Sequence, residues 1–134
     1  MMKEVSICLI GLALIGCVYP VGRVVTSGHE YSKAAILFLD QPGTTREEAI
    51  ASLGQSSWES RQSRVLLYLW TTSMRWAVAL PPGGTEFQAD EKRRALLIAY
   101  DERGLVTDHA VCTIGKEPLE EACSKWSKSR VARP

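Results

Sequence analysis

The sequence has few of the residues and motifs that usually mark a chemical function. Its 134 residues include two histidines, four cysteines and 7% aromatic residues. Lys and Arg (16) nearly balance Asp and Glu (15), so the chain has no overall basic field for a nucleic acid. No Gly-rich phosphate loop precedes a predicted helix, and the Gly-x-Ser-x-Gly motif is absent. The length and the 46% of hydrophobic residues are typical of one globular domain.

The N-terminus has the plan of an export signal. A short segment with Lys3 precedes an apolar run over residues 5–16 that ends in a small residue, Gly16. We therefore expect residues 1–16 to be a signal peptide and not part of the fold. The alternatives are an uncleaved transmembrane anchor over residues 5–22 and a simple cleaved signal.

The tetrapeptide Leu-Ile-Gly-Cys at 14–17 resembles a bacterial lipobox. The resemblance implies diacylation of the Cys17 thiol and signal cleavage after Gly16. An Asp after the lipidated cysteine would retain such a lipoprotein in the inner membrane, but this chain has Val18 there. The resemblance therefore also implies that the protein is located at the periplasmic face of the outer membrane. The Pro- and Gly-containing residues 17–29 are predicted to be the lipidated N-terminus and a flexible tether.

Cysteine usage agrees with export. Cys8 leaves with the signal and Cys17 takes the lipid, so the folded part keeps Cys112 and Cys123. An even pair in an oxidising compartment predicts a disulfide. Two buried thiols, or a zinc site with His109 as a third ligand, remain the alternatives.

Several local signals predict helices in the folded part, residues 30–134. Residues 30–40 have a helical composition. Thr45 and Glu48 form a capping box for a helix that Gly54 ends. A C-terminal helix is predicted from an apolar stripe with i, i+3, i+4 and i+7 spacing, which comprises Leu119, Ala122, Cys123 and Trp126.

Four segments predict strands: residues 64–71, 74–80, 95–100 and 105–112. The polar residues 85–92 are predicted to be a loop, and the turn Asp101–Gly104 should pair the last two strands antiparallel. Both alternating sets of the strand over residues 65–70 are apolar, so both faces need cover. Either the tail helix and the tether cover the second face, or Tyr68, Trp70 and Trp76 form a partner surface.

Two stretches carry a family resemblance, Leu39–Gly54 with its Pro-Gly-Thr-Thr and Leu-Gly elements, and Leu97–Val106 with its Tyr-Asp-x-x-Gly turn. They resemble the small SmpA/OmlA (BamE-like) outer-membrane lipoproteins over roughly residues 33–112. The resemblance implies an α+β fold in which two short N-terminal helices pack on a three- to four-stranded antiparallel sheet. Here a C-terminal helix is added. It also implies a partner in the envelope, with barrel-assembly machinery as one candidate, and no active site.

The residues themselves offer little chemistry. Asp108 and His109 are strand neighbours that face opposite sides of a sheet, so they do not form a dyad. We therefore expect no catalytic residue, metal, cofactor, nucleic acid or small-molecule substrate. The basic tail residues are expected to be solvated, with contact to anionic head groups as the alternative: Lys125, Lys128, Arg130 and Arg133. The function predicted is a membrane-anchored, non-catalytic envelope adaptor. A periplasmic inhibitor or sensor that binds through its sheet is the alternative.

Overall fold

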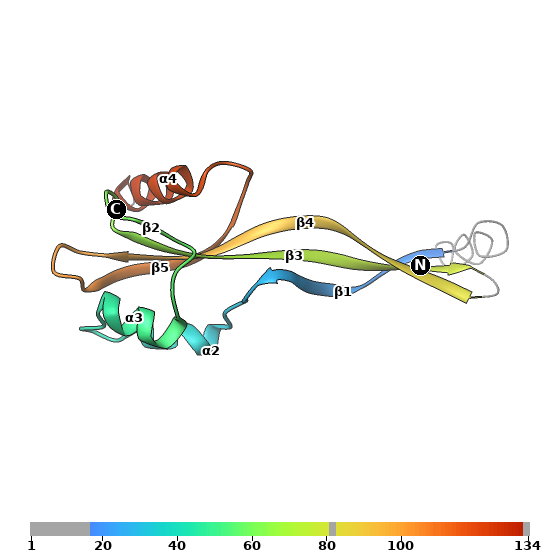
Figure 1. Cartoon of the computed structure of the whole chain (residues 1–134), viewed down its shortest axis with the longest axis horizontal. Helices are drawn as coiled ribbons and strands as arrows, with labels where there is room; N and C mark the ends of the chain where they lie inside the picture. Colours follow the sequence, from blue (N-terminus) through green and yellow to red (C-terminus); the bar gives the residue numbers. More distant parts are fainter. Residues whose placement is uncertain (1–16, 81–82, 133–134) are drawn as a thin grey trace. The chain divides into compact units, whose positions relative to one another are not determined.

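The computed structural model describes residues 17–80 and 83–132. The predicted signal peptide, with Cys8 and Gly16, lies outside the described residues. The fold is α+β, with an antiparallel sheet and a C-terminal helix, as predicted (Figure 1). The elements are β1 (Cys17–Gly28), α2 (Lys33–Ile36), a 3-10 helix η1 (Leu37–Asp40), α3 (Arg46–Leu53), β2 (Trp58–Ser60), β3 (Val65–Leu80), β4 (Gly83–Tyr100), β5 (Val106–Ile114) and α4 (Leu119–Ala132). Among these described elements, no helix combines the length and the apolar character that crossing a bilayer requires.

In the described residues the sheet has five strands, more than the three to four predicted, because the tether and residues 58–60 also pair with β3. The order is β1-β3-β4-β5, and β2 pairs with β3 antiparallel. The described residues divide into two compact units. Unit 1 comprises residues 17–26, 72–80 and 83–91, and unit 2 comprises residues 27–71 and 92–132. Strands β3 and β4 each contribute one half to either unit, and all the described helices belong to unit 2.

In unit 2 helices cover both faces of the sheet, with α2 and α3 on one face and α4 on the other (Figure 1). The first core contains Leu66, Tyr68 and Trp70 of β3, packed with side chains of α2, η1, α3 and β4: Ile36, Leu39, Ala49, Leu96 and Ile98. The second contains Val65 and Leu67 of the same strand, packed with β4, β5 and α4: Ala95, Leu97, Ile114, Ala122 and Cys123. The apolar alternation of β3 is thus buried on both sides.

This burial decides between the two readings of the aromatic residues. Tyr68 and Trp70 are only 3% and 2% exposed, so they are core residues and not a surface for a partner. The stripe predicted for the tail helix does cover the second face, with Leu119 and Trp126 packed beside the buried cluster. Trp76 belongs to unit 1, where it is half-buried.

Helix α3 has the predicted ends. The Thr45 side chain accepts a hydrogen bond from the Glu48 N–H at 3.1 Å, which satisfies one of the unpaired donors of the first turn. Gly54 ends the helix with a φ of +91°, a conformation that disfavours a residue with a Cβ. Two tyrosines then bind carbonyls that the helix leaves unpaired: the Tyr31 hydroxyl donates to Leu53 at 2.7 Å and the Tyr68 hydroxyl to Gly54 at 2.8 Å.

The predicted hairpin is also present. Strands β4 and β5 pair antiparallel, with Ala95 opposite Cys112 and Ile98 opposite His109. The turn places Gly104 at a φ of +82°, and one Asp101 carboxylate oxygen accepts the N–H groups of two turn residues.

Three segments differ from the sequence-based expectation. The predicted flexible tether is strand β1. Its valines and its tyrosine favour a strand, and its proline stands in a strand at the end of the sheet, where proline is tolerated. The predicted loop over residues 85–92 is part of β4, since polar side chains on a strand can face water. The strands predicted at 64–71 and 74–80 are one continuous strand, β3.

Candidate functional site

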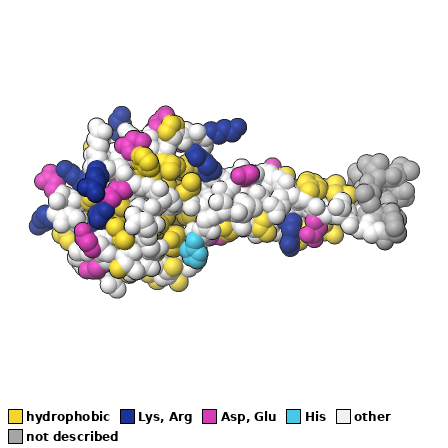
Figure 2. All heavy atoms as spheres, viewed as in Figure 1, with side chains coloured by type: hydrophobic (Ala, Val, Ile, Leu, Met, Phe, Trp, Pro, Cys, Tyr) yellow, Lys and Arg dark blue, Asp and Glu magenta, His cyan; other side chains and the backbone are white. Residues whose placement is uncertain are grey.

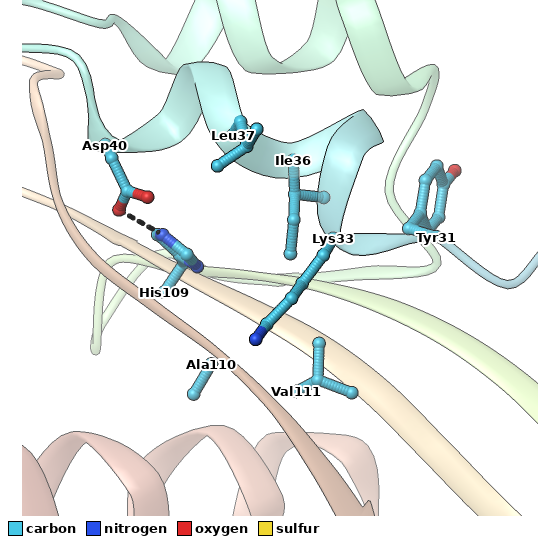
Figure 3. Close-up of a pocket in the computed structure, with 8 residues that line it drawn as sticks. All are labelled: Tyr31, Lys33, Ile36, Leu37, Asp40, His109, Ala110 and Val111. Carbon is cyan, nitrogen blue, oxygen red and sulfur yellow. Dashed lines mark hydrogen bonds and ion pairs between the residues drawn. The ribbon is translucent and has the colours of Figure 1, made fainter.

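A groove of about 580 Å³ lies in unit 2 beside the edge strand β5 (Figure 3). One wall is formed by α2, η1 and the residue that leads into them, and the other by β5. The lining residues are Tyr31, Lys33, Ile36, Leu37, Asp40, His109, Ala110 and Val111. Because β5 ends the strand order, its outer edge has no neighbouring strand in the described part of the chain.

Local structure explains why α2 can form a wall of this groove. The Ser32 side chain caps the helix by accepting the Ala35 N–H at 3.2 Å. One turn later Ile36 is buried in the first core and fixes the helix to the sheet. The next residue, Leu37, faces outward and is 62% exposed, and Val111 of β5 is also exposed. Apolar side chains that water can reach therefore stand on both walls.

A hydrogen-bonded pair closes one end of the groove. His109 Nε2 lies 2.7 Å from Asp40 Oδ1 and so links β5 to η1 (Figure 3). The preceding residue points the other way: Asp108 binds Arg130 of α4 at 3.0 Å, as expected for strand neighbours. Figure 3 shows the Lys33 side chain extending from α2 toward β5. The groove therefore has an apolar interior and polar groups of both signs at its rim.

The described lining of the groove contains no serine, threonine or cysteine. Its hydroxyl group, on Tyr31, donates a hydrogen bond to the Leu53 carbonyl. Within residues 17–80 and 83–132, no three His, Cys, Asp or Glu side chains are grouped as metal ligands. The apolar interior of the groove suits an apolar or extended ligand.

The two cysteines of the folded part lie on the opposite face, in the second core. Cys123 is fully buried and Cys112 packs at the edge of its cluster; both are thiols in the structure. Burial raises the pKa of Cys123 to about 11. His109 and Cys112 face opposite sides of the sheet, so they cannot bind one zinc ion together. The disulfide between Cys112 and Cys123 stays a prediction.

A second polar site of about 390 Å³ surrounds the β4–β5 turn of unit 2. The Arg46 guanidinium of α3 donates to both carboxylate oxygens of Glu59, at 2.8 and 2.5 Å, and the Tyr100 hydroxyl donates to the same carboxylate at 2.5 Å. The bond from Arg46 is the main reason why the pKa of Glu59 is lowered, while burial is the main reason why that of Tyr100 is raised. This ion pair joins α3 to β2 and β4, which is a structural role.

A scan of family models, a search of curated proteins and a search of solved structures each found no match to this chain. The function is therefore argued from the residues and their geometry. Sequence reasoning singled out Thr45, Glu48 and the two cysteines, but it did not bring Asp40 and His109 together. These two are 69 residues apart, and no local signal joins them.

Proposed function

We propose that the chain is a lipid-anchored bacterial envelope protein that works as a non-catalytic adaptor at the periplasmic face of the outer membrane. The observation that carries the proposal is the groove beside β5. It presents exposed Leu37 and Val111 next to a sheet edge, and none of the described lining residues is a serine, threonine or cysteine. Exposed apolar side chains around such a groove favour a protein ligand.

The sheet edge suggests how a partner binds. An extended segment of another protein can add to an edge strand by main-chain hydrogen bonds, while pockets on its side select particular side chains. The outer edge of β5 offers main-chain groups for such hydrogen bonds, and the groove beside it accepts apolar side chains between Leu37 and Val111. Both faces of this part of the sheet are already covered by helices, so the edge is where unit 2 can accept a strand.

The anchor is proposed from the lipobox, and its test is direct. We expect a fatty-acid analogue to label the wild-type chain, and the Cys17→Ala variant to lose the label. Persistent labelling of the variant would refute lipidation at this residue. The SmpA/OmlA resemblance also favours an envelope role. Its motif residues form a helix cap, a helix stop and a hairpin turn here, which bears on the fold more than on the role.

The binding role is tested by crosslinking from the groove in living cells. A photoreactive amino acid replaces Leu37 in one variant and the highly exposed Val131 of α4 in a control. Crosslinks to barrel-assembly proteins from position 37 alone would support the adaptor. A single soluble hydrolase captured at the same position would instead favour the inhibitor, and an activity that His109→Ala abolishes would show an enzyme.

A further inference from the structure

Unit 1 has an uncharged end that includes the predicted lipid attachment residue. In its described residues it consists of strand segments only: residues 17–26 of β1, 72–80 of β3 and 83–91 of β4. The sequence has no charged side chain at 17–22 or at 76–85. Because β1 and β4 both run antiparallel to β3, the described parts of these stretches, residues 17–22, 76–80 and 83–85, lie at the same end of the unit (Figure 1).

Large apolar side chains at and near this end face water. Val18, Tyr19 and Val21 of β1 and Phe87 of β4 are 41–55% exposed. Figure 2 shows apolar atoms on the visible face of this end of unit 1. A three-stranded sheet normally buries one apolar face against a helix or another sheet. The described residues of unit 1 include no helix that could serve.

Charged residues begin where the uncharged end stops. Arg23 on β1, Arg75 on β3 and Glu86 on β4 are the first charges on their strands, and the last two lie 3.8 Å apart. The unit is thus apolar at one end and bordered by two arginines and a carboxylate. This is the order in which a membrane-inserted segment meets the hydrocarbon boundary and then the head groups.

We propose that the uncharged end of unit 1 inserts into the interface of the bilayer that holds the lipidated Cys17. The inference rests on the proposed anchor, because β1 begins at Cys17 and successive strand residues rise about 3.3 Å. Val18 and Tyr19 must therefore lie within a few ångströms of the acylated residue. Water persists in the interface and can hydrate the strand edges, while Tyr and Trp side chains favour that depth. Insertion adds a second membrane contact to the lipid.

Photolabelling of the full chain in vesicles tests the proposal. The protein is purified from the envelope, reconstituted in phosphatidylethanolamine and phosphatidylglycerol, and exposed to a carbene probe confined to the bilayer. Trypsin releases residues 76–92 as one peptide, because Arg75 and Lys92 bound a stretch without Lys or Arg. Two peptides of unit 2 with exposed apolar side chains, residues 34–46 and 104–116, serve as controls. We expect the probe to label 76–92 far more strongly than either control.

Matched variants show whether labelling depends on insertion. Tyr19→Asp combined with Phe87→Asp changes exposed side chains, so the fold should persist, and labelling of 76–92 should fall about tenfold because aspartate resists transfer from water. Val131→Asp, a change at a highly exposed position of α4 in unit 2, should leave the labelling of 76–92 unaltered. Labelling of 76–92 no stronger than that of the controls would overturn the proposal, as would labelling that the double variant does not reduce.

The same sample separates this inference from the anchor. Mass analysis of the N-terminal peptide reports whether Cys17 is acylated. An acylated chain with unlabelled 76–92 would refute insertion and leave the anchor in place. A labelled 76–92 peptide from a chain without acyl groups would support insertion and refute the anchor.

Discussion

Glu59→Gln should destabilise unit 2, because Glu59 holds three structural elements together. Its carboxylate accepts two hydrogen bonds from Arg46 of α3 and one from Tyr100 of β4. The Arg46 and Glu59 side chains are 24% and 17% exposed, so water replaces these bonds poorly. Glutamine keeps the shape but removes the charge and turns one acceptor into a donor that faces other donors.

The size of the effect follows from the kind of bond. A hydrogen bond to a charged group contributes about 1.5–3 kcal/mol and a neutral one about 0.5–1.5 kcal/mol. Removing one partner of a fully buried pair costs about 3–5 kcal/mol, which partial exposure reduces. We therefore expect the free energy of unfolding to fall by about 2–3 kcal/mol for Glu59→Gln.

Urea unfolding followed by circular dichroism measures this loss, and the chain provides a matched control. Glu102 lies 3.6 Å from Arg64, but these side chains are 82% and 47% exposed. The same substitution there, Glu102→Gln, should cost at most about 0.5 kcal/mol. Equal losses at the two positions would refute the argument that burial and bidentate geometry make the Glu59 pair stabilising.

The pH dependence gives an independent check. Hydrogen bonds from Arg46 and Tyr100 hold the pKa of Glu59 below its ordinary value of 4.5. The folded state therefore binds this proton less readily than the unfolded state. The stabilisation is complete above the unfolded pKa and is lost as the pH falls through the folded one. The difference in stability between wild type and Glu59→Gln should thus be constant near neutrality and shrink in acid. A difference that grows in acid would contradict this assignment.

Three further predictions concern the packing of unit 2. Gly28→Ala should lower the free energy of unfolding by about 3 kcal/mol or more, because a Cβ there would lie 2.5 Å from the Leu69 carbonyl oxygen. Gly43→Ala, also at positive φ but with open space around it, should lower it by about 1 kcal/mol. Equal losses of stability for the two variants in urea unfolding would exclude the steric cause. Tyr68→Phe should lower the free energy of unfolding by about 1–2 kcal/mol in the same assay, because it leaves the Gly54 carbonyl without its hydrogen bond. An unchanged free energy of unfolding would show that water replaces the hydroxyl. If the cysteine pair of the second core is bridged after export, nonreducing mass analysis should give a mass about 2 Da below that of the reduced chain, and equal masses would exclude the bridge.

The sequence was most informative where the cause of a structure lies within a few residues. Thr45 and Gly54 delimit α3, and Gly104 turns the hairpin, because each acts on its own backbone or on that of near neighbours. The stripe of α4 was predicted for a similar reason: helical spacing alone determines which side chains share a face. That Cys123 faces a sheet and not solvent then followed from burying that stripe.

Strand β1 and the first half of β4 were missed because their structure depends on distant partners. Pro20 and Gly22 are typical of a linker, but proline is also tolerated on a strand at the end of a sheet. The polar residues before Glu91 are typical of a loop, yet a strand that faces water on both sides has the same composition. Asp90 even adopts a φ of +59° within β4, which an aspartate tolerates in an irregular strand.

The groove could not be predicted from the sequence for the same physical reason. Its walls come from residues 31–40 and 109–111, which are separated along the chain by α3, β2, β3 and β4. Asp40 and His109 pair only once η1 stands against β5. The sequence did predict that the strand at 65–70 needs cover on both faces. Because helices provide this cover, the two faces of the sheet in unit 2 are not available for binding a partner.

The two proposed contacts can be tested separately because they use different residues. The groove depends on α2, η1 and β5, whereas membrane insertion depends on residues 17–22, 76–80 and 83–85 and on Phe87 near them. Tyr19→Asp with Phe87→Asp should therefore lower bilayer photolabelling and leave crosslinking from position 37 to a soluble fragment of the partner unchanged. Loss of both signals from this one variant would mean that partner binding requires the inserted state. The adaptor would then recognise its partner only at the membrane, and the groove alone would be an insufficient account of binding.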